Sequence, residues 1–562
     1  MEQIFSSVDT MWVLLGAVLV FFMQAGFAMV ESGFTRAKNS GNIIMKNLMD
    51  FCIGTVVFWI IGFGLMFGTP DLGVIGTPDF FIQDDYSSIL GLSFPTLVYV
   101  IFQTVFCATA ATIVSGAMAE RTKFISYIIY SAVISAFIYP VSGHWIWGGG
   151  WLSQLGFHDF AGSTAVHMVG GIAAFIGAKI LGPRIGKYSK TGKSRAIPGH
   201  NLTIGALGVF ILWFSWFGFN GGSTISITGD DTLGLIGRIF TSTNMAAASA
   251  TITVMIITWI RYKKPDVSMT LNGSLAGLVA ITAGCDQIDM TGALFVGLAA
   301  GFVVVFGIEF VDKILKVDDP VGAVGVHGMC GALGTILTGV FSVSDGCLYG
   351  HGFRFLGIQL LGVLSVVVWV SVTMTIVFLA IKHTIGLRVT KEEELHGLDI
   401  EEHGLQSSYA DFVSSDSLAV SQKQNTPPET PAALVSSTSI EPSNDAPLSK
   451  VVIITRQSKL DELIAALNQI GVTGVTITNV LGCGKGAVVY YRGTQMNPQL
   501  LPKIKLEIAV SKVPVSKVID TAKRVLFTGE GGDGKVFISQ LQNVVKIHTG
   551  EEGYDALQDL DA

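Results

Sequence analysis

Long apolar stretches separated by short polar segments make up the first two thirds of the chain, up to about residue 390. Each stretch has about 20 residues, which as an α-helix is enough to cross a bilayer core of roughly 30 Å. The first has no basic flank before it and no small-residue cleavage site, so we expect a retained helix and not a cleaved signal. The pattern predicts a polytopic all-α membrane part with eleven transmembrane helices, at residues 11–33, 45–67, 96–119, 124–146, 160–182, 200–219, 238–260, 268–284, 291–311, 325–342 and 356–383.

No apolar stretch of this length follows residue 412. Residues 412–448 are rich in Ser, Thr and Pro, which is typical of a flexible linker. Beyond it, strands are predicted at 450–456, 475–482, 501–510 and 536–547 and helices at 458–471 and 515–527. Their order, β-α-β-β-α-β, is that of a ferredoxin-like α+β fold. The predicted domains are a membrane domain (1–385), a tail (386–411), the linker (412–448) and a soluble domain (449–562).

Composition supports this division and excludes several classes of function. Half of the 562 residues are hydrophobic and only 14% are charged, against roughly a quarter charged in soluble proteins. The six cysteines show no CxxC or Cys/His spacing, so neither a zinc site nor a disulfide framework is indicated. A net charge of −7 gives no sign of nucleic-acid binding. No activated nucleophile or metal constellation is found, so we expect no enzyme and no metal site.

Basic residues divide the loops of the membrane part into two alternating sets. One set holds Arg36, Lys38, Lys46, Arg121, Lys123, Arg184, Lys187, Lys190, Lys193, Arg195, Arg261, Lys263, Lys264, Lys313 and Lys316. The other set, at 68–95, 148–159, 220–237, 285–290 and 342–353, has no Lys or Arg. Because basic loops stay in the cytoplasm, we expect the N-terminus outside and the C-terminus inside. An odd number of spans agrees with this orientation.

Two segments of the membrane part share a pattern. In each, an Asp opens a span, a Gly follows three residues later and a His eight residues later: Asp159 with His167, and Asp319 with His327. The two spans have opposite predicted orientation, which indicates an inverted five-plus-five repeat with a functional site between the halves. Each Asp is also an ordinary helix N-cap, to which Asp159 would add stabilisation of an entering cation. Ionisable side chains inside a membrane usually line a path, so we expect both His residues in a pore.

Residues 8–411 resemble the Amt/Mep/Rh ammonium transporters. The motifs are MQAGFAMVESGFTRAKN (23–39), SGAMAERTKF (115–124), WGGGWL (147–152), DFAGSTAVHMVGGIAAFIGAKILGPR (159–184), WFGFNGGS (216–223) and DDPVGAVGVHGMCGALG (318–334). The resemblance implies a homotrimer in the cell (inner) membrane, with an outer recruitment site of Trp147, Phe106 and Ser223. It also implies a gate of stacked Phe106 and Phe219 with Trp216 nearby, and His167 and His327 sharing a hydrogen bond below.

The implied mechanism is physically reasonable. An aromatic face attracts NH4+ by a cation–π interaction, and a hydroxyl accepts one of its N–H bonds. A bare charge is costly in an apolar pore, so the ion would lose a proton near the gate and cross as NH3, without a cofactor. Whether the proton follows, which would make transport electrogenic, stays open at this point.

Residues 450–557 resemble the PII nitrogen-signalling proteins. The motifs include KLDELIAALNQIGVTGVTITNVLGCG (459–484), TGEGGDGKVF (528–537) and HTGEEGYDAL (548–557). The resemblance implies ATP or ADP as a regulatory ligand, bound between subunits of a trimer through Thr476, Gly484, Lys503, Gly532, Asp533, Gly534, Lys535, Lys546 and His548. The GGDGK run offers backbone N–H groups to phosphates, although alone it is also a common turn.

The soluble part departs from the PII pattern at several positions. Lys546 and His548 stand where the family has arginines in its last strand, and Met496 replaces the tyrosine that is uridylylated. The exposed loop lacks the Gln that helps to bind Mg2+ and 2-oxoglutarate, so that effector is not expected. Arg492, in YRG, is either a plug for the pore or a solvated loop cation.

Two functions follow as hypotheses. The first is a transporter gated by its own nucleotide-sensing domain, which the linker holds at an effective concentration in the mM range. The second is an ammonium sensor that signals through the soluble domain in the cytoplasm.

Overall fold

The computed structural model describes residues 5–69, 73–404, 407–408, 448–455, 459–472, 474–482, 489–491, 494–496, 501–511, 513–527 and 533–557. The chain forms two compact units, one of them largely helical and the other built on a sheet. The linker, which we place at 412–448, lies almost entirely outside the described residues, as do Gly484, Arg492 and Gly532.

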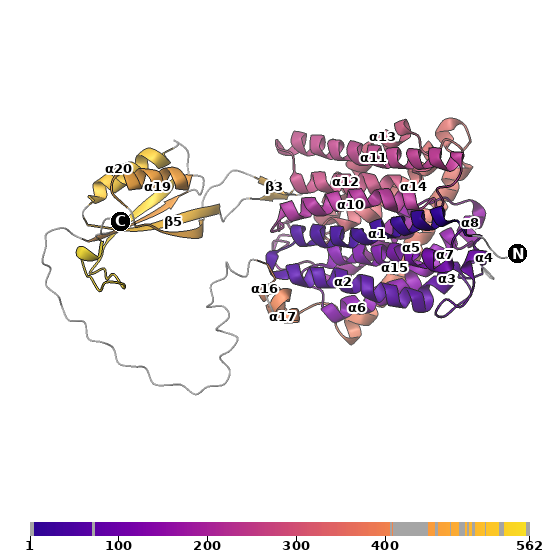
Figure 1. Ribbon diagram of the computed structural model, residues 1–562, viewed down its shortest axis with the longest axis horizontal. Coiled ribbons are helices and arrows are strands. Elements are labelled where there is room, and N and C mark those ends of the chain that lie inside the picture. Colours follow the sequence, from indigo (N-terminus) through magenta and orange to yellow (C-terminus); the bar gives the residue numbers. More distant parts are fainter. Residues whose placement is uncertain are drawn as a thin grey trace. The chain divides into compact units, whose positions relative to one another are not determined.

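The helical unit is a bundle of long apolar helices that lie side by side (Figure 1). Within the described residues, ten are long and apolar enough to cross a membrane: Ser7–Phe34, Ala37–Phe67, Thr96–Met118, Phe124–Leu155, Ser163–Leu181, Leu202–Gly222, Asp230–Tyr262, Met290–Ile314, Val324–Phe341 and Arg354–Thr384. An eleventh apolar helix, Val267–Ile281, has only 15 residues and falls at the predicted span 268–284. The unit is therefore a multi-pass membrane domain.

Several of these spans consist of consecutive helical pieces. The principal helices are α1 (Ser7–Phe34), α2 (Ser40–Val57), α3 (Phe63–Phe67), α5 (Thr96–Met118), α6 (Phe124–Val133), α7 (Tyr139–Trp147), α9 (Val169–Leu181), α10 (Leu202–Gly222), α11 (Asp230–Tyr262), α12 (Val267–Ile281), α13 (Met290–Glu309), α14 (Cys330–Phe341) and α15 (Arg354–Thr384). Short helices α4 (Tyr86–Ile89) and α8 (Trp151–Leu155) lie in the connections. Helix α11 begins at Asp230, eight residues before the predicted start, because Asp230 and Asp231 in its first turn suit the positive end of the helix dipole.

Helix α15 shows how sequence places these helices at the border between core and lipid. One stripe at four-residue spacing is fully buried: Val366, Val370, Met374 and Phe378. A second stripe at the same spacing is exposed: Leu364, Val368, Val372 and Ile376. A helix that is apolar on both its buried and its exposed face is typical of a membrane span.

Glycines let helices α1 and α10 pack backbone to backbone. A Cβ on Gly33 would lie 2.5 Å from the backbone N of Gly205, and one on Gly16 would lie 3.1 Å from the Cα of Gly222. Small residues at helix crossings provide the close packing that stabilises membrane bundles. These contacts hold α1 along the whole length of α10.

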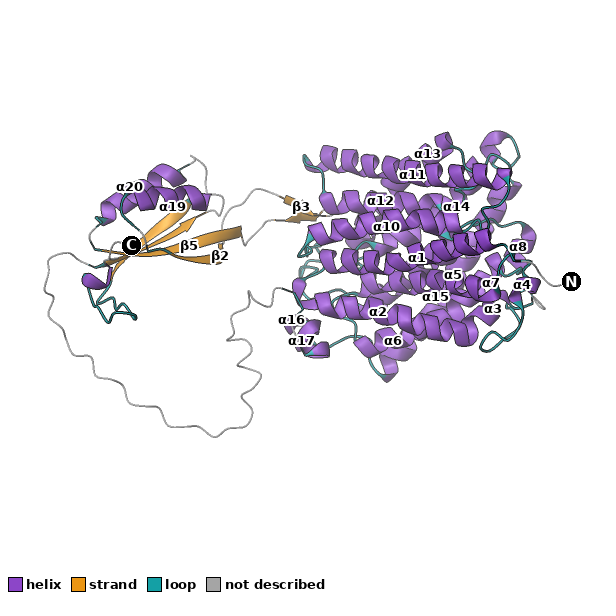
Figure 2. Ribbon diagram, viewed as in Figure 1, coloured by secondary structure: helices purple, strands orange, loops and turns teal. Residues whose placement is uncertain are grey.

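The second unit is a four-stranded antiparallel sheet with two helices on it (Figure 2). The strand order is β2-β5-β1-β6, from β1 (Ser449–Thr455), β2 (Thr476–Gly482), β5 (Leu501–Val510) and β6 (Gly534–Gln540). Helices α19 (Leu460–Gln469) and α20 (Val515–Leu526) pack on the sheet through a core that includes Val451, Ile453, Leu463, Leu506 and Val518. The predicted element order is confirmed by these residues, and β5 has the predicted bounds.

The last strand is shorter than predicted. β6 ends at Gln540 and not at residue 547, because the Asn543 side chain accepts from the N–H groups of Val544 and Gly553 and turns the chain. Lys546 and His548 therefore lie after the strand and not in it.

A two-stranded hairpin, β3 (Val489–Tyr491) with β4 (Thr494–Met496), forms where the sequence predicted only a loop.

Candidate functional site

Two buried imidazoles face each other inside the helical unit. The Nδ1 atoms of His167 and His327 lie 3.2 Å apart, and the two rings stack with centroids 5.2 Å apart. Since a hydrogen bond needs one donor and one acceptor, only one of the two Nδ1 atoms carries the proton. The Nε2 atom of His167 is buried and has no hydrogen-bond partner among the described residues. That atom is free to meet a small polar molecule that enters the site.

Both histidines stand on a turn of π-helix that follows the same local structure. Asp159 accepts from the N–H groups of Gly162, Thr164 and Ala165, and Gly162 has a positive φ of 112°. The π-turn Ser163–Met168 follows and carries His167. Thus the Asp159 carboxylate caps its helix, as the N-cap interpretation predicts.

The second segment repeats this arrangement. Asp319 accepts from the N–H groups of Gly322 and Val324, Gly322 has φ of 85°, and the π-turn Val324–Met329 carries His327. The shared Asp-Gly-His spacing in the sequence therefore corresponds to one backbone arrangement: a capping Asp, a Gly with positive φ and a π-turn that carries the His. It points both imidazoles into the same buried space.

Glycines set the distance between the two histidine-bearing helices. A Cβ on Gly171 would lie 2.1 Å from the backbone N of Gly328, and one on Gly331 would lie 2.5 Å from the carbonyl O of Ser163. Any larger residue at either position would push the backbones apart. The contact between His167 and His327 therefore depends on this close helix crossing.

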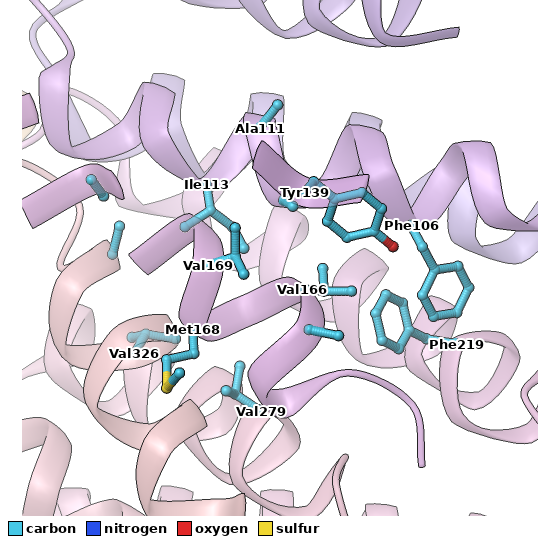
Figure 3. Packing of buried hydrophobic residues seen from close by; sticks show 14 of the residues in the cluster. Phe106, Ala111, Ile113, Tyr139, Val166, Met168, Val169, Phe219, Val279 and Val326 are labelled. Atoms are coloured by element: carbon cyan, nitrogen blue, oxygen red, sulfur yellow. The ribbon is translucent and has the colours of Figure 1, made fainter. Parts of the chain in front are cut away.

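A row of aromatic rings leads to the histidines. The rings of Phe106 and Phe219 stack with centroids 4.2 Å apart, and Figure 3 shows them side by side next to Val166. Phe106 also meets the half-buried Trp147, at 6.2 Å, and Phe219 meets His167, at 5.3 Å. Phe106 and Phe219 are buried, so the stacked pair separates the Trp147 side from the histidines.

Trp216 lies beside the histidines and is not part of the stacked phenylalanine pair. Its ring stacks on His167 at 4.9 Å, and its Nε1–H donates to Thr282 Oγ1 at 2.8 Å. The ring thereby forms one wall of the histidine site. The Trp216 ring also lies 5.5 Å from that of Phe219, so it is near the predicted gate, as the family resemblance implies.

Trp147, Asp159 and Ser223 complete the set of residues predicted for the outer site. The Trp147 Nε1–H donates to the carbonyl O of Asp159 at 2.7 Å, so the indole is tied to the start of the His167 segment. Ser223 is half-buried, and its hydroxyl donates to the carbonyl O of Phe219 at 2.8 Å, which leaves the hydroxyl lone pairs free to accept.

A buried ion cluster lies at the start of the His327 segment and was not predicted from the sequence. The Arg184 guanidinium binds Asp318 at 2.8 Å and Glu120 at 2.8 Å, and Arg36 also pairs with Glu120. Burial works against both carboxylates, but Arg184 outweighs it and holds the pKa of Glu120 and of Asp318 below their ordinary values. Both carboxylates stay ionised at neutral pH. The adjacent DD pair in DDPVGAVGVHG was the available signal.

The predicted tail packs against the same region of the helical unit. It contains α16 (Lys391–His396) and α17 (Leu398–His403). Glu394 binds Arg388 at 2.7 Å and accepts from the N–H of Ile185, while Asp399 accepts from the N–H groups of Gly41 and Asn42 at the start of α2. The tail is thus joined to the loop that holds Arg184.

In the sheet unit, the predicted nucleotide residues that the structure describes form two groups, with Thr476 apart from both. Lys503, Asp533, Gly534 and Lys535 lie at one end of the sheet, where Gly534 pairs with Thr455 and the Thr455 hydroxyl donates to the carbonyl O of Asp533. Lys546 and His548 follow β6 beyond its other end. Thr476, at the start of edge strand β2, pairs with Glu507.

An open groove of about 790 Å³ lies beside the first group. Asp533, Gly534 and Lys535 line it, together with Lys523, Arg524 and Phe527 from the end of α20. Three cations and one aromatic ring are a suitable lining for an anionic ligand with an apolar part. Lys523 and Arg524 were not predicted from the sequence as ligand-binding residues, although both lie in the last turn of α20.

These features define a class of protein: a multi-pass membrane protein whose bundle encloses an aromatic row ending in paired histidines. Residues 11–408 match the model of the Ammonium Transporter Family, and the chain belongs to that family. Residues 448–551 match the model of the Nitrogen regulatory protein P-II family, so a P-II domain is fused behind the transporter part.

Curated relatives and solved structures agree with this assignment. The chain is 45% identical over 440 residues to "Ammonium transporter Amt2" of Archaeoglobus fulgidus, covering 74% of this chain and 92% of the relative. A solved structure called "Sensor Amt Protein" superposes with a TM-score of 0.67 at 41% identity, over 70% of this chain and 98% of that one. Mep2 of Candida albicans superposes with a TM-score of 0.64 at 28% identity, over 74% and 93%.

Proposed function

We propose that the membrane domain transports ammonium by binding NH4+ beside Trp147, removing one proton and passing neutral NH3 to the histidine pair. The observation that carries this proposal is the pair itself, with two Nδ1 atoms 3.2 Å apart at the end of a row of buried rings. A bare cation there would cost many kcal/mol. Ammonia is neutral and has both N–H donors and a lone pair, so neutral imidazoles can bind it at each step.

The proposed roles follow the order of contacts. Trp147, Phe106 and Ser223 bind the arriving cation through ring faces and a hydroxyl oxygen, and Asp159 adds negative charge close to the Trp147 indole. Phe106 and Phe219 form the gate that excludes water. Beyond it, His167, with Trp216 on its face, and His327 line the pore.

The proposed arrangement in the membrane has eleven spans, with α12 as the short one, and an inverted repeat that relates the two Asp-Gly-His segments. The loop charges favour the N-terminus outside and the tail and soluble domain in the cytoplasm, in a cell (inner) membrane. The domain limits 1–385, 386–411, 412–448 and 449–562 belong to the same proposal.

Reconstitution of the full chain into liposomes tests transport directly. An inward ammonium gradient should produce uptake of the label or a change of luminal pH well above protein-free liposomes, with K+ excluded. Bound but untransported ammonium would contradict the proposal.

The P-II domain is proposed to bind ATP or ADP and to regulate transport. The cationic groove of Lys523, Arg524 and Lys535 supports an adenine nucleotide as ligand. Lys546 and His548 follow the end of the sheet opposite to this groove. A nucleotide site that combines the groove residues of one copy with Lys546 and His548 of another copy would form between the subunits of a homotrimer. Arg492, which lies outside the described residues, remains the candidate pore plug.

A second candidate function is an ammonium sensor, favoured by the likeness to the structure called "Sensor Amt Protein". Uptake by the full chain and by a truncation near residue 412, each with and without ATP or ADP, separates the two. Equal rates in all conditions would exclude regulation by the P-II domain, and ammonium binding without any transport would favour the sensor.

A further inference from the structure

The aromatic row ends in a small cavity at His327. Contacts order the rings as Phe106, Phe219, His167 and His327, and the cavity is lined by His327 but not by the other three. Its volume is about 20 Å³, and roughly 10–15 Å³ of such space holds one water-sized molecule. Ammonia is of this size, so the cavity has room for one ammonia molecule beside His327, at the end of the row remote from Trp147.

Most of the cavity wall is apolar, but it also contains a carboxyl group. Phe27, Val30, Ile113 and Val326 supply apolar surface, and Glu31 contributes its side chain. Phe27 contacts the His327 ring at 5.9 Å, and Glu31 follows one turn further along α1, a rise of roughly 6 Å. Glu31 is therefore the next ionisable group after His327 along the path.

The hydrogen bonds of Glu31 leave one oxygen available. The Ser115 hydroxyl donates to Oε2 at 2.7 Å, and the Asn47 side-chain N–H donates to the same oxygen at 3.2 Å. Among the described residues no hydrogen bond reaches Oε1. Glu31 lines the cavity, so its second oxygen can form a hydrogen bond with a molecule in that space. This is more than is needed to join α1, α2 and α5.

Among the described residues, no cation forms an ion pair with Glu31. Lys46 and Asp50 act on it electrostatically, but Lys46 donates to the carbonyl O of Thr122 at 2.9 Å, and Asp50 accepts from Ser131 and Thr112. Within the described part of the chain, Glu31 forms no ion pair. A buried carboxylate without a counter-ion is costly, so this group readily takes up a proton that reaches the cavity.

We propose that Glu31 is the proton-transfer group at the inner end of the pore, which takes up the proton lost by NH4+ and returns it to NH3. NH4+ releases a proton near the gate, and this proton moves over the histidine pair to the Glu31 carboxylate. In the cavity the O–H bond of the carboxylic acid breaks and an N–H bond forms, so that NH3 leaves as NH4+ and the carboxylate is restored. One NH4+ enters and one leaves, and transport is electrogenic. The inference rests on the proposed transport function.

The test compares the full-length wild type with Glu31→Gln, Glu31→Asp and the control Glu309→Gln in liposomes. Glu309 is also buried but pairs with Arg261 and Lys313 away from the cavity. Two signals are recorded, the ammonium-evoked current and the luminal alkalinisation caused by NH3 entry. We expect Glu31→Gln to lower the current by roughly tenfold or more and to increase luminal alkalinisation over the wild type, because NH3 then enters without its proton. Glu31→Asp and Glu309→Gln should keep the current.

The outcomes separate the inference from the function on which it rests. A wild type with neither signal contradicts transport itself, and a wild type with alkalinisation but no current contradicts only the role of Glu31. Equal currents in wild type and Glu31→Gln, or equal losses in Glu31→Gln and Glu31→Asp, also overturn that role. If Glu31→Gln does not fold, infrared difference spectra of the wild type with 13C-labelled glutamate decide: a glutamic-acid band that responds to ammonium is expected, and its absence overturns the inference.

Discussion

His167 Nδ1 and His327 Nδ1 lie 3.2 Å apart although 160 residues separate them in the chain. One proton is shared between the two nitrogens, so each imidazole fixes the tautomer of the other. The Nε2 atom of His167 is buried without a hydrogen-bond partner among the described residues, and the stacked Phe106 and Phe219 lie beside the pair. The pair is thus a single polar unit in an apolar path.

The first prediction concerns this unit. His327→Ala removes the hydrogen-bond partner of His167 and leaves a second buried nitrogen of His167 unpaired. His167→Ala removes the partner of His327 in the same way. We therefore expect ammonium flux or the exclusion of K+ to change in both variants. The measurement is uptake with competing K+ in liposomes. His351→Ala is the control, because His351 is exposed. Unchanged flux and unchanged K+ exclusion in both variants would remove the histidines from the pore.

The second prediction separates the gate from ordinary aromatic packing on the same helix. Phe219→Ala opens the stacked pair with Phe106, so water should enter and the preference for ammonium over K+ should fall. Phe217 stacks on Phe240 at 5.1 Å, away from the histidines, so Phe217→Ala should leave selectivity unchanged. The same liposome assay measures both. An equal response of the two variants would mean that the effect comes from lost packing alone.

The third prediction concerns the helix crossing. Gly171→Ala places a Cβ 2.1 Å from the backbone N of Gly328, which the backbones relieve only by moving apart. We expect a lower melting temperature and a destabilisation of about 1–3 kcal/mol. Gly357→Ala, in the first turn of α15 with open space around it, should be neutral or slightly stabilising. Thermal unfolding in detergent compares the two, and equal melting temperatures would contradict the crossing.

The fourth prediction concerns the ion cluster. Glu120→Gln leaves Arg184 with one buried partner in place of two, and we expect a loss of about 3–5 kcal/mol. Glu392→Gln, on the exposed face of α16, is the control. The folded-state pKa of Glu120 is lowered by Arg184 against the effect of burial, so its stabilisation is present above the unfolded pKa and is lost as the pH falls. The cluster should therefore stabilise the wild type at neutral pH, and loss of this contribution should lower the melting temperature only as the pH falls below about 4.

The fifth prediction concerns the groove of the P-II domain. Lys535→Ala should weaken ATP or ADP binding to the full chain by about tenfold or more, because a hydrogen bond to a charged group contributes about 1.5–3 kcal/mol. Titration calorimetry measures this. Lys517→Ala, an exposed lysine in α20 outside the groove, should bind as the wild type does. Equal affinity of wild type and Lys535→Ala would exclude this lysine from the nucleotide site.

Apolar spans, the Asp-Gly-His repeat and the alternation of strands could be found in the sequence because each depends on residues close together in the chain. The bounds of β5 and the existence of a helical turn at both histidines follow from such local patterns. The end of β6 could not be found in this way, because the turn that stops the strand is held by the Asn543 side chain bonding to Gly553, ten residues away.

What the sequence determined by itself is the membrane class, the fused α+β domain and the identity of the two intramembrane histidines. The family resemblance implied that these histidines meet, and the tertiary structure supplies the contact itself. Only the tertiary structure decided that Trp216 stacks on His167 and that Glu31 shares a cavity with His327. The physical reason is that helix crossings at Gly171 and Gly331 bring distant segments within hydrogen-bonding reach. Hydrophobic periodicity fixes which face of a helix is buried, but not which side chain of another helix it meets.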